Sequence, residues 1–328
     1  MVNDKDFAFA GLLPDVVINA IESLGIYPSS GLLPLNSYEN RVYQFRCDEG
    51  RRYVAKFYRP HRWSNAQIEE EHLFSQQLLD DEVPVVAPLR ISDNTLHEFE
   101  GYRFAVFPSI GGRAFEPNDL DDLERLGRQI GRLHQVGKKS SFRARESLDI
   151  QRLLTESIDE LRRSQLLPEE LQAAFWAILS PLADKLQTFA WDSLAYQRLH
   201  GDCHIGNVLQ YDTELTFVDL DDCRMGPAVQ DLWMMLNGSR EDQTCQLDAL
   251  IEGYQDFCDF DKKEIAFIEP LRGFRLIHYM AWLSKRWQDS AFQRAFPWFS
   301  EARYWESQIL ALKEQRAALD EAPIKLGY

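Results

Sequence analysis

Long apolar runs are missing from this chain of 328 residues: nothing approaches the roughly 18 consecutive apolar residues that a membrane-spanning helix needs. We therefore exclude a membrane-spanning protein and expect no membrane partner. Residues 1–6 carry neither the basic start nor the apolar core of a secretion signal. Cysteine is scarce, with five residues and no C-x-x-C pair, so a disulfide framework is not indicated. Reduced thiols and a cytoplasmic location are the expectation.

Positive charge is also in short supply, with 36 Lys and Arg against 52 Asp and Glu and a formal net charge of -16. A chain with this charge is repelled by a phosphate backbone, so we expect no nucleic-acid partner. One basic stretch stands out, made of Arg51, Arg52, Lys56, Arg59, His61 and Arg62. Because apolar residues interrupt this stretch and part of it follows a strand pattern, we interpret it as the solvated end of a strand.

Internal repeats and low-complexity tracts are absent as well, and the chain instead changes its hydrophobic pattern along its length. The first hundred residues predict a small β-rich lobe with strands at 41–46, 52–58, 88–92 and 102–107 and helices at 14–24 and 64–79. Ser64 is the expected N-cap of the second helix. From about Asp119 the apolar spacing becomes helical.

The remainder of the chain predicts a larger, mainly helical lobe with one small β insertion. Helices are expected from about residue 119 and at 150–164, 169–190, 228–237, 245–257 and 262–288, and a hairpin at 208–211 and 215–220. The fold class is α+β with two lobes, an N-lobe over 1–108 and a C-lobe over 109–328. The glycines of the segment PSIGG at 108–112 suit a hinge between them.

The chemistry concentrates in the β insertion, which reads HGDCHIGN at residues 200–207. His200, Asp202 and Asn207 match the H-x-D-x-x-x-x-N spacing of the kinase catalytic loop, in which the Asp receives the proton of the acceptor hydroxyl and the Asn binds Mg²⁺. Three fixed positions also arise by chance, and the alternative is a polar turn between a helix and a strand.

Asp219 strengthens the kinase interpretation, because it follows Asn207 by twelve residues and ends an apolar strand. One amide oxygen, one carboxylate and nucleotide phosphates satisfy Mg²⁺, a hard cation that keeps several waters. Asp221 and Asp222 crowd the same place. Two interpretations stay open for them, a second metal ligand or a turn at the surface.

Lys56 sits on a predicted strand, as the phosphate-pairing lysine of kinases does. A glutamate on the helix that follows is the expected partner of this lysine. Glu71 is favoured over Glu69 and Glu70 because the helical spacing to Phe74 and Leu78 places it beside the buried face.

Together these residues resemble a known family. HGDCHIGN at 200–207 with Asp219, GRQIGRLH at 127–134 and GPAVQD at 226–231 are similar to the aminoglycoside-phosphotransferase and choline-kinase branch of the protein-kinase-like fold. The resemblance is closer still to bacterial Ser/Thr protein kinases of envelope-stress and cell-survival responses. It rests there on LNSYENRVYQF at 35–45, HGDCH at 200–204, FVDLDD at 217–222, DLWMMLN at 231–237 and FPW at 296–298.

The resemblance implies an ATP-dependent kinase and a role for each matching residue. Asp202 is implied as the proton acceptor, and Asn207 and Asp219 as Mg²⁺ ligands. Nucleotide binding is assigned to the phosphate loop at Ser37, to the pair Lys56 and Glu71, to the hinge at Phe107 and Ser109, and to His204, which would face the γ-phosphate. Asp231 is implied to brace the catalytic loop.

The chain departs from protein kinases in two places. The phosphate loop reads NSYEN at 36–40 and has no G-x-G-x-x-G, so a Ser37 hydroxyl is the expected substitute donor. No A-P-E follows, and only six residues separate Asp219 from Gly226. The resemblance nevertheless implies a Ser/Thr protein kinase able to phosphorylate itself, and we expect a monomer.

The short segment between Asp219 and Gly226 keeps an alternative open, a kinase that phosphorylates a small hydroxyl compound such as an amino alcohol, sugar or aminoglycoside.

Overall fold

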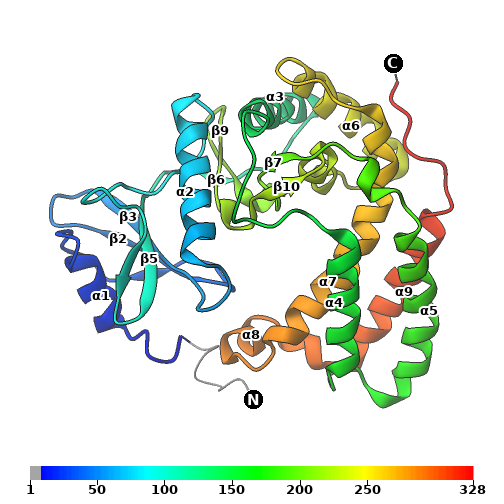
Figure 1. Cartoon of the computed structure of the whole chain (residues 1–328), viewed down its shortest axis with the longest axis horizontal. Helices are drawn as coiled ribbons and strands as arrows, with labels where there is room; N and C mark the ends of the chain where they lie inside the picture. Colours follow the sequence, from blue (N-terminus) through cyan, green and yellow to red (C-terminus); the bar gives the residue numbers. More distant parts are fainter. Residues whose placement is uncertain (1–8, 328) are drawn as a thin grey trace.

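The computed structural model describes residues 9–327, which form two lobes (Figure 1). The N-terminal lobe is built on one antiparallel sheet, with strand order β1-β2-β3-β5-β4. Its strands are β1 (Leu33–Pro34), β2 (Arg41–Arg46), β3 (Arg52–Phe57), β4 (His97–Phe99) and β5 (Tyr102–Pro108). Lys56 on β3 lies between Val42 of β2 and Ala105 of β5, so the central strand carries the predicted lysine.

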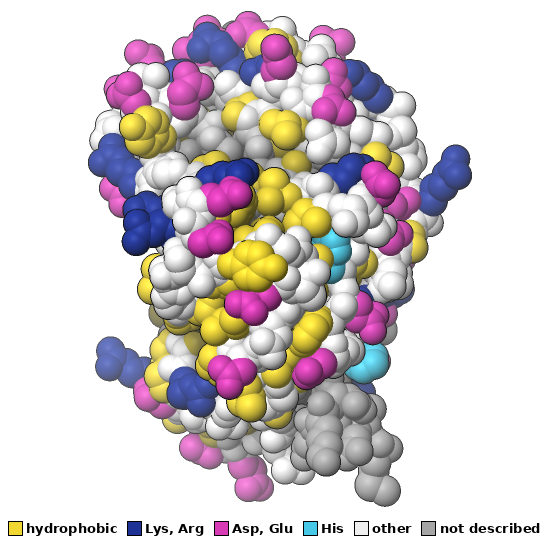
Figure 2. Space-filling view, turned by 90° about the vertical axis from the view of Figure 1, so that its left-hand side faces the viewer, with side chains coloured by type: hydrophobic (Ala, Val, Ile, Leu, Met, Phe, Trp, Pro, Cys, Tyr) yellow, Lys and Arg dark blue, Asp and Glu magenta, His cyan; other side chains and the backbone are white. Residues whose placement is uncertain are grey.

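One face of this sheet is covered by α1 (Pro14–Glu22), whose buried residues Val17, Ala20 and Ile21 pack with Phe45 and Phe57 of the strands. The other side faces α2 (Asn65–Asp80), and Ile68 of that helix packs with Tyr58 and Ala105. Seen from the N-terminal lobe, acidic and basic side chains are interspersed over the surface (Figure 2).

Helix α2 begins as predicted, because the Ser64 hydroxyl accepts from Gln67 N–H and the Gln67 side chain accepts from Ser64 N–H. Its buried side includes Glu71, Phe74 and Leu78. Phe74 and Leu78 belong to the large core of the C-terminal lobe, so this helix packs against both lobes.

The C-terminal lobe is mainly helical (Figure 1). Its helices are α3 (Leu120–Gly137), α4 (Ile150–Arg163), α5 (Glu169–Gln187), α6 (Arg240–Gln255), α7 (Ile268–Arg286), α8 (Ser290–Ala295) and α9 (Ala302–Ala318). Helices α3 and α6 touch backbone to backbone, since an added Cβ at Gly127 would lie 2.1 Å from the Leu250 carbonyl oxygen. The glycines of GRQIG therefore serve helix packing.

Short strands place the loops of this lobe beside the N-terminal lobe. The predicted hairpin is β8 (Val208–Tyr211) and β9 (Glu214–Phe217), to which β6 (Arg113–Ala114) adds a third strand. A second pair, β7 (Gln197–Leu199) and β10 (Arg224–Gly226), was not predicted. These two small sheets hold both ends of the catalytic loop.

Three element predictions are wrong. Residues 88–92 form an irregular segment, and the edge strand is β4 instead. Residues 228–237 form two 3-10 turns rather than an α-helix, because Pro227 starts the segment and nearly every side chain in it is buried, so no amphipathic helix face is present. The helix expected over 262–288 is a 3-10 turn (Lys262–Phe267) followed by α7.

Within the described residues, no helix is both long and apolar enough to cross a membrane. The five cysteines all lie in that part of the chain, and each is a free thiol, with Cys245 exposed and the other four buried.

Glu264 gives the fold a pH-dependent stability. It is 4% exposed, its Oε2 accepts from Val229 N–H at 2.8 Å, and burial raises its pKa from 4.5 to about 7. The folded protein holds this proton more tightly than the unfolded chain, so the contribution of Glu264 to the free energy of unfolding should fall by about 3 kcal/mol as pH rises through this window. Urea unfolding of the wild type and of Glu264→Gln at pH 5 and pH 8 measures this contribution as a difference between the two proteins.

Glu264→Gln keeps an acceptor oxygen for the Val229 N–H. It should remove the contribution of Glu264 to the pH dependence of the free energy of unfolding. Glu306→Gln, at an exposed position of α9, is the control. Equal pH dependence in the wild type and in Glu264→Gln would contradict the prediction.

Candidate active site

The β8–β9 hairpin brings Asn207 and Asp219 together. Val208 pairs with Phe217, and Val218 N–H donates to the Asn207 carbonyl at 3.0 Å, so the residues that flank the hairpin are neighbours. Asp219 adopts a left-handed conformation with φ 58°, which ends β9 at this point. Its side chain is 52% exposed.

Asp202 lies beside them on the catalytic loop. The Asn207 Nδ2 donates to the Asp202 carbonyl at 3.0 Å, which leaves the Oδ1 of the amide to bind a cation. The Asp202 carboxylate contacts Arg275 Nη1 at 2.9 Å and His204 Nε2 at 3.4 Å. Burial raises the pKa of Asp202, but the His204 hydrogen bond and the Arg275 charge outweigh burial and hold the pKa below its usual range. Asp202 is therefore an ionised acceptor.

The catalytic loop is braced from behind by a buried network. Asp231 accepts from His200 N–H at 2.7 Å and from Gly201 N–H at 2.9 Å. Its Oδ2 also lies 3.0 Å from His134 Nε2, while His134 Nδ1 lies 2.9 Å from the Tyr254 hydroxyl. Asp231 and His134 are fully buried, and Asp231 holds the loop backbone, which is the role that the resemblance implies for it.

Lys56 is surrounded by three carboxylates. Its Nζ lies 3.0 Å from Asp219, 3.1 Å from Asp221 and 3.6 Å from Glu71. Burial lowers the pKa of Lys56, but the three carboxylate charges outweigh it and raise the pKa well above its ordinary value. The lysine is therefore a permanent cation next to the Asn207–Asp219 corner.

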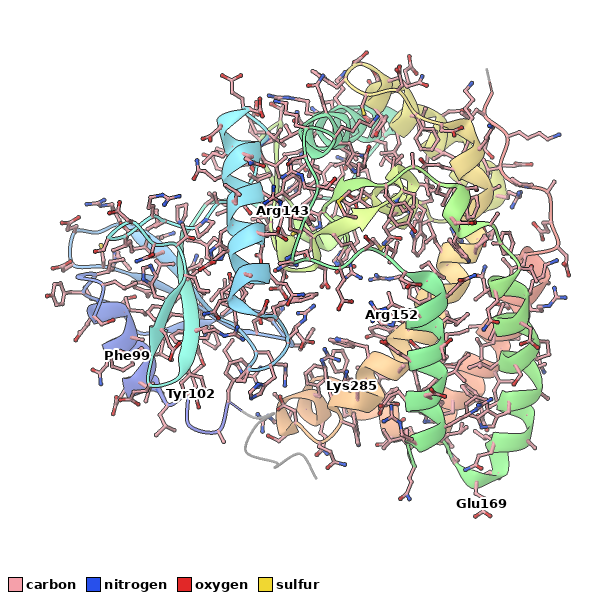
Figure 3. All side chains as sticks on the ribbon, in the orientation of Figure 1. Phe99, Tyr102, Arg143, Arg152, Glu169 and Lys285 are labelled. Atoms are coloured by element: carbon pink, nitrogen blue, oxygen red, sulfur yellow. The ribbon has the colours of Figure 1, made fainter. Side chains whose placement is uncertain are left out.

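Glu71, rather than Glu69 or Glu70, reaches Lys56. Glu70 instead accepts from the backbone N–H groups of residues 143–145, at 2.7 to 2.9 Å. Arg143, labelled in Figure 3, marks where this loop passes α2.

A second cation, Arg145, was missed by the sequence analysis. It is buried, pairs with Glu71 at 2.9 Å and donates to the Cys223 carbonyl at 3.1 Å. Burial raises the pKa of Glu71 above its ordinary value, because it outweighs the opposing charges of Lys56 and Arg145. A lone arginine in a loop carries no sequence signal for such a role.

Asp221 is no surface residue: it is 3% exposed and pairs with Lys56 and Arg62. Burial raises the pKa of Asp221, but the Lys56 and Arg62 charges lower it to about 2. Arg62 also binds both Asp222 oxygens at 2.9 Å. The surface-turn interpretation is therefore wrong for Asp221.

The basic stretch is not simply solvated either, because Lys56 and Arg59 are buried and Arg62 turns into the cleft.

A cavity of about 1060 Å³ opens onto this corner. It is lined by residues 36–40 of the phosphate loop, including Ser37, by Asp202, His204, Asn207 and Asp219, and by α4 and α7. Figure 3 labels Arg152 of α4 and Lys285 of α7, two of the basic residues that line this space. The phosphate loop, the carboxylates of the catalytic loop and an open cavity are thus brought together between the lobes.

The expected hinge residues lie at the end of β5. Phe107 packs near Tyr58 and Ile68, with its ring edge-on to His72 at 6.3 Å. Ser109 N–H donates to the Arg52 carbonyl at 3.0 Å, and its hydroxyl accepts from Gln44 at 2.8 Å. Neither residue lines the cavity, and contact with adenine stays a prediction.

Comparison with known proteins agrees with this geometry. Residues 31–268 match the model of a family described as phosphotransferase enzymes. The chain belongs to this phosphotransferase family. It is 47% identical over 325 residues to stress response kinase A of Escherichia coli K12 and to serine/threonine protein kinase RdoA of Salmonella typhimurium LT2, covering 99% of each chain.

A solved amicoumacin kinase, in complex with AMP-PNP, Ca²⁺ and a molecule named Ami, has the same fold, with a TM-score of 0.72, 18% identity and 95% of each chain covered. The predicted two-lobed α+β fold, the family and the assignment as a kinase are therefore confirmed. As a member of this phosphotransferase family, the chain is an enzyme that transfers phosphoryl groups.

Proposed function

We propose that the chain is an ATP- and Mg²⁺-dependent Ser/Thr protein kinase of a bacterial stress response. It acts in the cytoplasm as a monomer and phosphorylates itself as well as a protein acceptor. Residues 1–108 bind nucleotide, and residues 109–328 hold the catalytic loop and the acceptor. The observation that carries the proposal is the convergence of Asp202, the Asn207–Asp219 corner and the Lys56–Glu71 pair beside one cavity.

The donor set suits a hard divalent cation. One amide oxygen from Asn207 and a half-exposed Asp219 carboxylate are oxygen ligands, which Mg²⁺ prefers over nitrogen or sulfur. Bound there, the metal neutralises charge on the nucleotide phosphates. Lys56, held by Glu71 and Asp221, supplies a fixed cation for the same phosphates. Ser37 and His204 both line the cavity. Ser37 acts as a hydroxyl donor to the phosphates, and His204 faces the γ-phosphate.

Asp202 performs the remaining step. Its carboxylate is ionised, and Arg275 and His204 orient it toward the cavity. It accepts the proton of an acceptor hydroxyl as the oxygen attacks the γ-phosphorus, while the bond from that phosphorus to the bridging β–γ oxygen breaks and ADP leaves. The Asp231 brace keeps the loop backbone in place, so most of the catalysis comes from positioning and charge.

A second candidate is phosphorylation of a small hydroxyl compound. Asp219 is followed at once by a 3-10 turn (Leu220–Asp222) and by β10, which pairs with β7. This leaves no long activation segment on which a peptide is laid. Residues of α4 and α7 also line the cavity, whose volume of about 1060 Å³ suits a small acceptor. These features favour an enclosed acceptor rather than an extended one.

Labelled ATP distinguishes the two candidates. The purified protein with Mg²⁺ and γ-labelled ATP should label itself and a generic Ser/Thr-rich protein. The label should survive acid and be released by hot alkali through β-elimination, as phosphoserine and phosphothreonine esters are. Asp202→Asn serves as the inactive control. Label confined to amino alcohols, sugars or aminoglycosides would replace the first candidate by the second. No label on any acceptor would overturn both.

A further inference from the structure

The phosphate loop, residues 36–40, is held by side chains rather than shaped by glycine. Arg59 Nε donates to the Glu39 carbonyl at 2.9 Å, and Arg59 Nη2 donates to the Tyr38 carbonyl at 3.3 Å. Asn40, which is 2% exposed, accepts from Arg59 N–H at 3.0 Å. The backbone of this loop is therefore fixed by the segment that follows β3.

The same loop is bonded to the C-terminal lobe. The Glu39 carboxylate accepts from Trp282 Nε1 at 3.0 Å and from Arg286 Nη2 at 2.9 Å, both on α7. It also pairs with Arg59 at 3.1 Å, and its side chain is 11% exposed. Burial raises the pKa of Glu39, but the charges of Arg62, Arg286 and Arg59 outweigh it and lower the pKa. Glu39 is thus a buried anion that bridges the lobes.

A second bridge lies alongside the first. Asp289, the N-cap of α8, accepts from Arg59 Nη2 at 2.9 Å, and the Tyr38 ring packs on Phe296 at 4.6 Å. In Figure 1, α8 lies below the N-terminal lobe, away from the hinge after β5. The lobes are therefore joined on the side of the cleft opposite the hinge as well.

One face of α7 connects this bridge to the catalytic loop. Arg275, Tyr279, Trp282 and Arg286 recur at helical spacing, and all four line the cavity. Arg275 contacts the Asp202 carboxylate, while Trp282 and Arg286 contact Glu39. A single rigid helix thus sets both the proton acceptor and the phosphate loop.

We propose that Glu39, Trp282 and Arg286, which we call the Glu39 clamp, are positioning residues that order the phosphate loop for the nucleotide before it binds. The inference rests on the proposed nucleotide site. A loop ordered in advance loses less conformational freedom on binding, and its affinity for nucleotide is correspondingly higher. The clamp takes over the positioning that a glycine-rich loop otherwise achieves by close backbone approach.

Two matched substitutions on α7 test the clamp. Trp282→Phe removes the N–H donor to Glu39 and keeps an aromatic ring. Trp287→Phe makes the same change at the C-cap of α7, where the ring packs on Phe299 at 5.3 Å and does not touch Glu39. We expect Trp282→Phe and Glu39→Gln to weaken Mg-ATP binding by about tenfold in calorimetry, since one hydrogen bond to a charged group is lost. Trp287→Phe should bind as the wild type does.

Amide hydrogen exchange of residues 36–40 gives a readout that needs no nucleotide. Exchange should be faster in Trp282→Phe and Glu39→Gln than in the wild type or Trp287→Phe. In steady-state assays the KM for ATP should rise while the KM for the acceptor stays unchanged. A general loss of stability would instead lower the melting temperature. At low temperature, the KM values for ATP and for the acceptor would then both equal those of the wild type.

The outcomes separate the clamp from the proposed function. Faster loop exchange with unchanged Mg-ATP affinity would overturn the clamp as a positioning device, and so would equal exchange in Trp282→Phe and Trp287→Phe. A wild-type protein that binds no Mg-ATP would overturn the proposed nucleotide site. In that case the proposed role of the Glu39 clamp in nucleotide binding would be overturned as well.

Discussion

Asp202→Asn is expected to lower the turnover number by roughly 10²- to 10⁴-fold, the usual contribution of a positioned acid or base, and to leave Mg-ATP affinity unchanged. The carboxylate lies in the cavity, ionised by its contacts with Arg275 and His204. An asparagine keeps the size of the side chain and an oxygen for Arg275. It has no carboxylate to receive the proton of the acceptor, so chemistry fails while binding persists.

The measurement is single-turnover phosphoryl transfer, combined with calorimetric titration of Mg-ATP. Asp256→Asn is the matched control, because Asp256 also pairs with an arginine, Arg128 at 2.7 Å, but lies outside the cavity. Turnover of Asp202→Asn equal to that of the wild type would remove Asp202 from the mechanism. A large loss in Asp256→Asn would show that the effect is not local.

Asp219→Ala should abolish the Mg²⁺-dependent stabilisation of the protein by ATP. At a ligand concentration of 100 times Kd, the wild type gains about 2.7 kcal/mol in free energy of unfolding, and the variant should gain almost none. The loss is specific because Asp219 is half exposed, and Lys56 keeps Asp221 at 3.1 Å and Glu71 at 3.6 Å. Thermal unfolding with and without Mg-ATP measures it.

Asp212→Ala is a close control for the backbone. Asp212 has φ 54° in the turn between β8 and β9, and Asp219 has φ 58°. Alanine is strained in this left-handed region, so both variants should lose a similar amount of intrinsic stability. Only Asp219→Ala should lose the response to Mg-ATP. A retained response in that variant would mean that the metal is bound elsewhere.

Local patterns were enough for most of the elements. The alternation of β2 and β3, the Ser64 capping box and the apolar stripes of α3 and α4 are properties of neighbouring residues, and they appear as predicted. Two of the failures share one cause. Residues 228–237 and the strand β7 are almost entirely buried, so their side chains show no periodicity that distinguishes one element from another.

The site shows the same division. The spacing of Asp202, Asn207 and Asp219 is a property of one hairpin, and Lys56 and Glu71 follow from a strand and the helix after it. Arg145, Arg275 and the Glu39 clamp join segments that are 73 to 247 positions apart in the chain. Nothing in a linear pattern relates such positions, because only packing of the two lobes brings their charges together.

By itself, then, the amino-acid sequence determined the two-lobed fold class and the phosphotransferase family, and it predicted the residues of the catalytic loop and the Lys56–Glu71 pair, since each of these depends on short-range order. Only the tertiary structure decided which cations meet Asp221 and Glu39. Burial removes water from Asp221 and Glu39, and a buried charge is stable only where the fold supplies a partner for it.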